Sequence, residues 1–137
     1  GQKMSKSYGN AIAMRDTAEV VEDKIRTMPT DPQRVRRSDA GDPARCPVWP
    51  LHQLYTDEGT RVGLEQGCKT ASIGCLDCKQ PLIEAIQQEQ APWRERANEY
   101  LANPKQVHWI VEVGAERARA VARKTLREVR SAMGLAY

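Results

Sequence analysis

Four cysteines are the residues of this sequence whose type and spacing most directly indicate chemistry. They follow the pattern C-x21-C-x6-C-x2-C, at Cys46, Cys68, Cys75 and Cys78. The two-residue spacing of the last pair lets both thiolates reach one ion or cluster, and Gly67 and Gly74 let the backbone approach it closely. With no histidine expected near them, we predict one metal centre with four thiolate ligands.

Other uses of these cysteines are less favoured. Three of them fall within 11 residues, which argues against four unrelated buried thiols. Disulfides are rare in the reducing cytosol, where we expect this chain to be. Zinc sites made of four thiolates are common, but zinc ribbons usually carry two C-x2-C pairs and this sequence has one. A compact triplet with one remote ligand is common in iron–sulfur proteins. Spacing alone therefore leaves zinc and an iron–sulfur cluster equally favoured.

Cys46 lies apart from the other three, in a segment rich in proline. Residues 29–50 contain five prolines and should form an extended loop with few ladder hydrogen bonds. A metal centre that includes Cys46 would tie this loop to the helices. Loss of any ligand should then disorder residues 40–50 as well as release the metal.

The first residues form a second candidate site. Residues 2–10 read Gln-Lys-Met-Ser-Lys-Ser-Tyr-Gly-Asn. Such a loop can fold over a polyphosphate, where lysines neutralise the charge on a leaving pyrophosphate and hydroxyls add hydrogen bonds. A solvated terminal segment is the simpler alternative.

Five of these residues give the sequence a family resemblance. Lys3-Met4-Ser5-Lys6-Ser7 is similar to the KMSKS signature of class I aminoacyl-tRNA synthetases, and Gly9-Asn10 continues it in the same way. The resemblance implies that these five residues form a loop at the ATP site. It also implies that Lys3 and Lys6 stabilise the transition state of adenylate formation, with Lys6 the more important.

Further segments resemble the tryptophanyl-tRNA synthetases within that class. They are residues 30–32, 34–39, 41–43 and the stretch from 114 to 135. The cysteine segments resemble the subset of that family that binds a [4Fe–4S] cluster, within about one residue of its spacing. The resemblance favours iron–sulfur over zinc and implies a structural cluster. A tyrosyl-type enzyme shares the signature, but we do not expect this cysteine set there.

Helical periodicity accounts for most of the remaining chain. We expect helices over residues 16–28, from Thr56 to about 66 with Thr56 as its cap, from near Pro81 towards 101 with a kink at Pro92, and from Asn103 onward with a break at Gly114. Residues 67–78 should form a tight cysteine loop. We predict an all-α fold, a small helical bundle. Residues 1–15 would form the lysine loop, detached from a catalytic domain, and residues 16–137 the helical domain.

The last helix has a regular apolar stripe, which we expect to be buried. It comprises Ala118, Val121, Ala122, Thr125, Val129 and Met133. Arginines lie on its other faces. With 137 residues, no Phe and 5% aromatic residues, the core should be small, and a metal would help to stabilise it.

The composition and the resemblance together suggest the partner. The formal charge of +3 and pI of about 8.8 permit an acidic partner such as RNA. The resemblance implies an anticodon-binding domain that binds tryptophan-accepting tRNA. The candidate RNA contacts are Arg34, Arg36, Arg37, Arg119 and Arg123, although an arginine-rich helix face is more often simply solvated.

The resemblance also sets limits on this chain. The nucleotide-binding domain of the family should precede residue 1, so the fragment alone should neither bind ATP tightly nor activate tryptophan. The intact enzyme should be a homodimer with contacts largely in that domain, which leaves a monomer as the expectation here. No apolar run suits a membrane span or a signal peptide, and we expect a cytoplasmic protein. A zinc-stabilised helical module that binds nucleic acid or protein is the alternative function.

Overall fold

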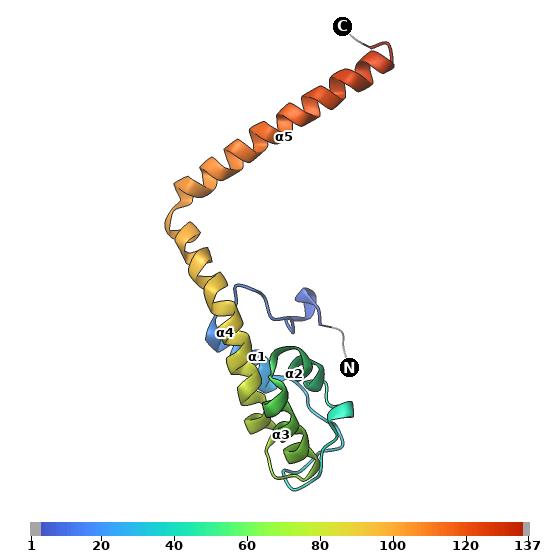
Figure 1. Cartoon of the computed structure of the whole chain (residues 1–137), viewed down its shortest axis with the longest axis vertical. Coiled ribbons are helices and arrows are strands. Elements are labelled where there is room, and N and C mark those ends of the chain that lie inside the picture. The colour runs from blue at the N-terminus through green and yellow to red at the C-terminus, as the bar shows by residue number, and fades with distance from the viewer. Residues whose placement is uncertain (1–3, 136–137) are drawn as a thin grey trace. The chain divides into compact units, whose positions relative to one another are not determined.

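The computed structural model describes residues 4–135, and every regular element in that range is helical (Figure 1). The predicted all-α class is therefore confirmed. In chain order the elements are η1 (Lys6–Tyr8), α1 (Ala18–Thr27), η2 (Pro43–Arg45), α2 (Trp49–Tyr55), α3 (Glu58–Lys69), α4 (Cys75–Ala102) and α5 (Pro104–Ala132). Within residues 4–135, none of these helices combines the length and the apolar character that a membrane crossing requires.

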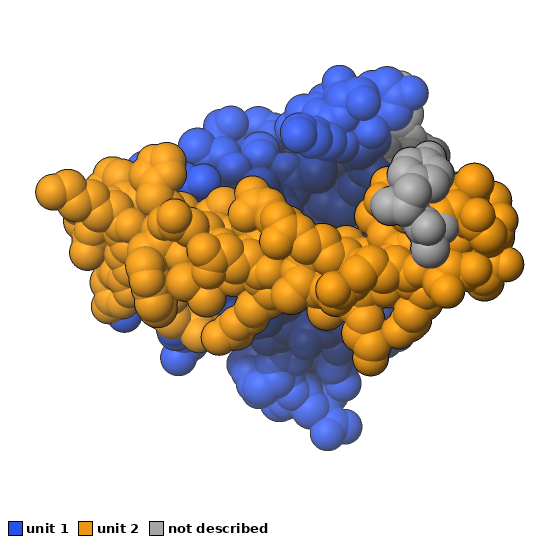
Figure 2. Space-filling view, turned by 90° about the horizontal axis from the view of Figure 1, so that it is seen from above, with its two compact units in different colours: residues 1–95 blue, residues 96–137 orange. Residues whose placement is uncertain are grey.

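The chain divides into two compact units, which Figure 2 shows in separate colours. The first runs from Gly1 to Glu95 and the second from Arg96 to Tyr137, so the boundary falls inside α4. The first unit holds the lysine loop, all four cysteines and the core. The second holds the end of α4 and the whole of α5.

Helix α1 forms where the sequence predicts it. Thr17 caps its start and accepts a hydrogen bond from the backbone N–H of Val20 at 3.4 Å. Val21 and Ile25, one turn apart on the same face, are buried. Pro29 follows directly after the last turn, where its missing N–H prevents the helix from continuing.

The hydrophobic core of the first unit is small and aliphatic, as its composition predicts. It comprises Val21, Ile25, Val48, Leu82, Ile83 and Ile86. These residues come from α1, from the chain just before α2 and from the first half of α4. The core therefore packs the helix that begins at Cys75 against α1 and the proline-rich segment.

Polar contacts join α4 to α1 around this core. The buried Lys79 ammonium donates to the carbonyls of Arg26 at 2.7 Å and Met28 at 2.6 Å, at the carboxyl end of α1. A cation at that position satisfies carbonyls that the helix leaves unpaired. At the other end, Gln87 Nε2 donates to the Ala18 carbonyl at 2.8 Å. The first turns of α4 are thus fixed relative to α1.

Several predicted boundaries around the cysteines are wrong. Asp57, not Thr56, caps α3, and α3 continues through Gly67 to Lys69. The predicted cysteine loop is much shorter, because α4 begins at Cys75 rather than near Pro81. Helix α2 was not expected at all. Cys68 accordingly lies in the last turn of α3, and Cys75 and Cys78 lie in the first turn of α4.

The proline-rich segment is organised around the buried side chain of Asp31. Its carboxylate accepts hydrogen bonds from Arg45 Nε at 3.2 Å and Nη2 at 3.0 Å, and from the backbone N–H groups of Gln33 at 3.0 Å and Asp42 at 2.8 Å. The side-chain bond from Arg45, followed by these N–H groups, lowers the Asp31 pKa to about 2. One buried carboxylate therefore ties together residues 31–45.

This arrangement predicts how stability depends on pH. The folded-state pKa of Asp31 lies below its unfolded value of about 4, so its contribution to stability is complete above about pH 4 and is lost as the pH falls towards 2. Asp31→Asn should lower the urea midpoint of unfolding at pH 7, and the difference from the unaltered chain should shrink between pH 4 and 2. The control is Asp23→Asn, on an exposed position of α1. Equal midpoints for the Asp31 variant and the unaltered chain at pH 7 would contradict the role of Asp31.

Helix α5 differs most from expectation. Asn103 caps it, as predicted, and accepts from the Gln106 backbone N–H at 3.3 Å. The helix passes through Gly114 without the predicted break, and α4 continues through Pro92. Over the described residues of α5 no side chain is buried, and Val121 is 69% exposed. The predicted burial of its apolar stripe is wrong, because nothing in the second unit covers it.

Candidate functional site

All four cysteines line one small cavity in the first unit. The cavity has a volume of about 30 Å³, more than a single water molecule needs. Cys46 reaches it from the end of η2, Cys68 from α3, and Cys75 and Cys78 from α4. The four thiols are thus brought to one place by three different segments, and each is partly buried.

Burial makes these thiols hard to ionise by themselves. It raises the pKa of Cys78 to about 12 and also raises that of Cys68, and the neighbouring sulfur groups add to the effect. Four thiolates facing one cavity repel each other unless a cation lies between them. The donor set is therefore suited to a metal centre and poorly suited to a reactive nucleophile.

Two cationic side chains also line the cavity. Arg34 is buried, and its Nη2 donates to the carbonyls of Arg37 at 2.9 Å and Ile73 at 2.7 Å. Among residues 4–135, the Arg34 Nε atom is the one buried side-chain nitrogen or oxygen atom that has no hydrogen-bond partner. Lys79 is the second cation. A centre with four thiolates carries net negative charge, so an unpaired buried N–H and two cations in its walls fit such a group.

The backbone approaches one of the sulfur atoms very closely at Gly41. Its N–H donates to the Cys68 carbonyl at 3.0 Å, and a Cβ atom built on Gly41 would lie 2.6 Å from Cys68 Sγ. Any side chain at this position would displace the sulfur. Gly41 therefore lets the proline-rich segment lie directly against α3.

A histidine accompanies the thiols, contrary to the expectation of none. His52 is buried in α2, and its Nε2 lies 3.7 Å from Cys78 Sγ. Its Nδ1 lies 2.9 Å from the Thr56 hydroxyl oxygen. Burial lowers the His52 pKa, which favours the neutral ring. In sequence, His52 and Thr56 are separated by one helical turn, but that signal is visible only once α2 is recognised.

The side chains do not close around a position for a single ion. Within the described part of the chain, no three His, Cys, Asp or Glu side chains are grouped as one metal ion requires. The thiols line a shared cavity without meeting at one point. Whether they bind metal stays a prediction.

The predicted RNA contacts fall in three settings. Arg34 is interior, which favours a role in the cysteine cavity. Arg36 and Arg37 are exposed and line an open groove with Val35, Gly74, Leu76 and Asp77. Cys75 and Arg34 line both this groove and the cysteine cavity. Arg119 and Arg123 are exposed on α5 in the second unit. Their contacts with RNA stay predictions.

The groove beside the cysteines also has apolar walls that sequence reasoning missed. Val35 is 84% exposed and Leu76 is 52% exposed. Arg37 pairs with Asp77 at 3.6 Å, which holds one guanidinium at the groove. A surface that combines guanidinium planes with exposed apolar side chains can stack bases and hold phosphates.

The lysine loop is a compact turn over the residues that the structure describes. The Ser5 N–H donates to Asn10 Oδ1 at 2.7 Å, and Ser5 Oγ accepts from the Ser7 N–H at 3.3 Å. Gly9 takes a left-handed conformation, with φ of 66°, at the end of η1. Lys6 is exposed, so its ammonium can reach an anionic ligand. Lys3 lies outside the described residues.

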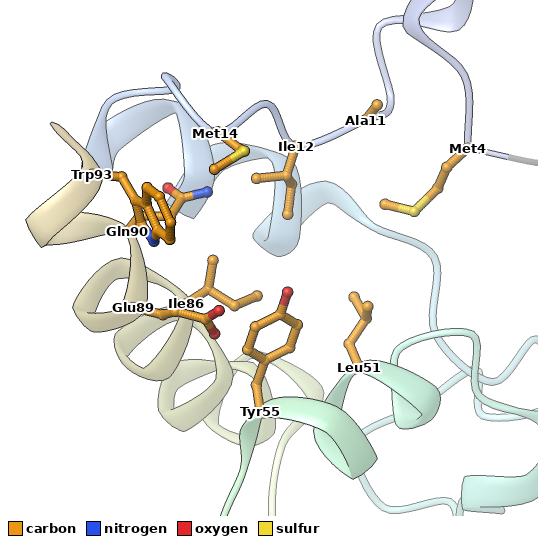
Figure 3. Close-up of a pocket in the computed structure, with 10 residues that line it drawn as sticks. All are labelled: Met4, Ala11, Ile12, Met14, Leu51, Tyr55, Ile86, Glu89, Gln90 and Trp93. Carbon is orange, nitrogen blue, oxygen red and sulfur yellow. The ribbon is translucent and has the colours of Figure 1, made fainter. Parts of the chain in front are cut away.

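Met4 lines a larger apolar pocket of about 310 Å³ (Figure 3). The figure shows Ile12 and Met14 from the N-terminal segment, Leu51 and Tyr55 from α2, and Ile86 and Trp93 from α4 around the same space. Among the described residues, Glu89 and Gln90 are the only charged or amide side chains in its lining. As far as residues 4–135 show, the pocket offers apolar contact area and no set of catalytic groups.

Comparisons with known proteins identify a family and several relatives that this chain is similar to. The family model described as tRNA synthetases class I (W and Y) matches residues 1–89. A Tryptophan--tRNA ligase from Ralstonia nicotianae is 56% identical over 137 residues, which are all of this chain and 34% of that protein. One from Thermotoga maritima is 44% identical over 138 residues, which are all of this chain and 42% of that protein.

A solved structure has the same fold. The crystal structure of tryptophanyl-tRNA synthetase from Campylobacter jejuni complexed with ADP and tryptophan superimposes with a TM-score of 0.84 at 27% identity. The match covers 98% of this chain and 42% of that one. The chain thus spans well under half the length of these relatives. Since the family match extends over more than half of the chain, the protein belongs to the class I tRNA synthetases (W and Y).

Proposed function

We propose that this chain is the C-terminal, tRNA-recognising part of a tryptophan–tRNA ligase, which attaches tryptophan to its tRNA at the expense of ATP. The observation that carries the proposal is the 56% identity to such a ligase over the whole chain. The exposed Lys6 in a closed KMSKS turn supports the ATP-site role of residues 3–7. The intact protein would be a homodimer, and its reduced thiols suit the cytoplasm.

We propose further that Cys46, Cys68, Cys75 and Cys78 hold a structural [4Fe–4S] cluster. The all-thiolate donor set, the two cations in the cavity walls and the unpaired Arg34 Nε–H support it. When bound, the cluster supplies positive charge and four attachment points to the thiolates. Zinc is the alternative.

An elemental assay of protein purified without oxygen tests this assignment. Four irons and four sulfides per chain, with visible colour, would support the cluster. One zinc per chain without sulfide would establish the alternative. A chain with no metal would reject both assignments, while the family membership and the tRNA-binding proposal would remain.

The groove beside Cys75 is the surface we propose for the tRNA anticodon region. Arg36 and Arg37 are exposed there, and Val35 and Leu76 provide apolar area. The metal centre lies under the same segment, since Cys75 lines both spaces. It would act as a rigid strut for the groove. Arg119 and Arg123 on α5 would contact phosphates elsewhere on the tRNA.

Charge reversal in the groove provides a direct test. Arg36→Glu combined with Arg37→Glu should weaken binding to tryptophan tRNA about tenfold or more at low salt, because hydrogen bonds to charged groups contribute about 1.5–3 kcal/mol each. The slope of log K against log salt should fall by about one per lost phosphate contact. Filter binding or fluorescence titration across salt concentrations measures both quantities.

The matched control makes the same charge change elsewhere. Arg15→Glu combined with Arg61→Glu alters two arginines that do not line the groove, and it should have a smaller effect. A tRNA with another anticodon should bind the unaltered chain more weakly than tryptophan tRNA. Unchanged affinity of the groove variant at low salt would remove Arg36 and Arg37 from the interface.

A further inference from the structure

His52 is held rigidly against one of the proposed ligands. It lies in α2, where its backbone N–H donates to the Val48 carbonyl at 3.3 Å. Its ring lies 5.7 Å from that of Trp49, and its side chain is only 1% exposed. Its Nε2 faces Cys78 Sγ at 3.7 Å, within hydrogen-bonding distance for sulfur. Nothing in the lysine-loop chemistry or the tRNA groove accounts for this buried imidazole.

Thr56 fixes the other side of the ring. Its backbone N–H donates to the His52 carbonyl at 3.0 Å, one turn along the helix, and its hydroxyl oxygen lies 2.9 Å from Nδ1. Thr56 is itself buried. A buried polar group of this kind is costly unless it is hydrogen-bonded, so both ring nitrogens are matched to a partner.

Metal binding would determine which nitrogen carries the proton. A neutral imidazole has one N–H donor and one acceptor. A metal-bound Cys78 is a thiolate, which can only accept. The favourable arrangement therefore places the proton on Nε2, directed at Sγ, and leaves Nδ1 as an acceptor. The Thr56 hydroxyl can rotate to donate to Nδ1, which completes a chain of donors from Thr56 through His52 to Cys78.

We propose that His52 is a positioning residue of the metal centre, which donates from Nε2–H to the Cys78 thiolate while the Thr56 hydroxyl holds its tautomer. This inference rests on the proposed metal centre but not on whether iron–sulfur or zinc occupies it. Hydrogen bonds of this kind orient ligands and reduce the charge on sulfur, and their loss typically weakens metal binding 10–100-fold. Arg34 and Lys79 in the cavity walls offset the negative charge of the whole centre. His52 instead donates a hydrogen bond to one sulfur, Cys78 Sγ.

The rate of metal release to an excess of chelator, from protein prepared without oxygen, tests the proposal. His52→Leu removes the donor and should release metal about 10–100-fold faster than the unaltered chain. His52→Gln, whose amide nitrogen can reach the place of Nε2, should restore much of the difference. Thr56→Val removes the hydroxyl at nearly constant volume and should accelerate release by a smaller factor. Thr125→Val makes the same change on α5 and should have no effect.

The tautomer of His52 can be measured directly, and it would not depend on the Thr56 hydroxyl if His52 only filled space. ¹⁵N NMR of the metal-loaded chain should show His52 protonated at Nε2, and this preference should weaken in Thr56→Val. A proton on Nδ1 in the loaded chain would overturn the proposal even if His52→Leu failed to fold. Equal release rates for the unaltered chain and a folded His52→Leu would overturn it as well. Elemental analysis of the unaltered chain tests the metal centre separately. A chain without metal would reject the metal centre and, with it, the proposed role of His52.

Discussion

Cys78→Ser should release essentially all of the bound metal and unfold much of the first unit. Metal binding at structural thiolate sites contributes about 10–16 kcal/mol in small domains, as much as or more than the whole stability of a typical domain, about 5–15 kcal/mol. The core here holds six buried aliphatic side chains, so the free energy of unfolding that remains without the metal should be small. Metal content by elemental analysis and helicity by circular dichroism measure the two losses.

The same experiment on the other three cysteines tests whether one centre uses all four. Serine at Cys46, Cys68 or Cys75 should cause a similar loss of metal, because the four thiols line a single cavity. Cys46→Ser should in addition increase hydrogen exchange across residues 40–50. Full metal content in any one folded variant would exclude that residue as a ligand. Ser38→Ala, an exposed change in the same segment, serves as the control.

Local signals in the sequence predicted the elements whose ends are set by neighbouring residues. Asn103 caps α5 as expected, because capping depends on a side chain and an N–H group three residues away. The thin aliphatic core was also predictable, since the sequence contains no Phe.

The elements around the cysteines could not be assigned in the same way. The spacing of Cys75 and Cys78 was interpreted as a loop, but three positions along a chain are also one turn of helix. Pro81 suggested a helix start, yet it is tolerated one turn and a half into α4. The buried Lys79, bonded to the end of α1, favours the longer helix. Such long-range contacts are not visible in a local pattern.

Periodicity also could not predict burial in α5. It correctly indicates which side chains share a face, but not whether another part of the chain covers that face. Val121, Val129 and Met133 share a stripe and are all exposed.

The sequence correctly indicated that the four cysteines lie near one another, since all four line one cavity, but it did not reveal the side chains around them. That the cysteines are metal ligands stays a prediction. Arg34 was predicted to contact RNA together with Arg36 and Arg37, but it is buried whereas they are exposed. Its interior position follows from the carbonyls of Arg37 and Ile73, the second of which is 39 residues away. His52 was missed because α2 was missed.

Lys6→Ala, made in the intact synthetase to which we propose this chain belongs, should slow adenylate formation about 10²–10³-fold. Removing one preorganised donor from a developing negative charge has an effect of this size. Lys6 is exposed on a turn closed by Ser5, Asn10 and Gly9, so its loss should leave the turn folded. ATP–pyrophosphate exchange measures the rate, and a fall in kcat larger than any rise in KM would indicate transition-state stabilisation.

Two comparisons make this prediction specific. Arg15→Ala removes an exposed cation from the same segment and should leave the exchange rate nearly unchanged, while tRNA affinity and metal content should be unaltered in both variants. The 137-residue chain alone should show no exchange, because Lys3 and Lys6 would have no nucleotide pocket to act on. An intact Lys6→Ala enzyme with full activity would remove Lys6 from the reaction, and exchange catalysed by this chain alone would mean that it contains an ATP site of its own.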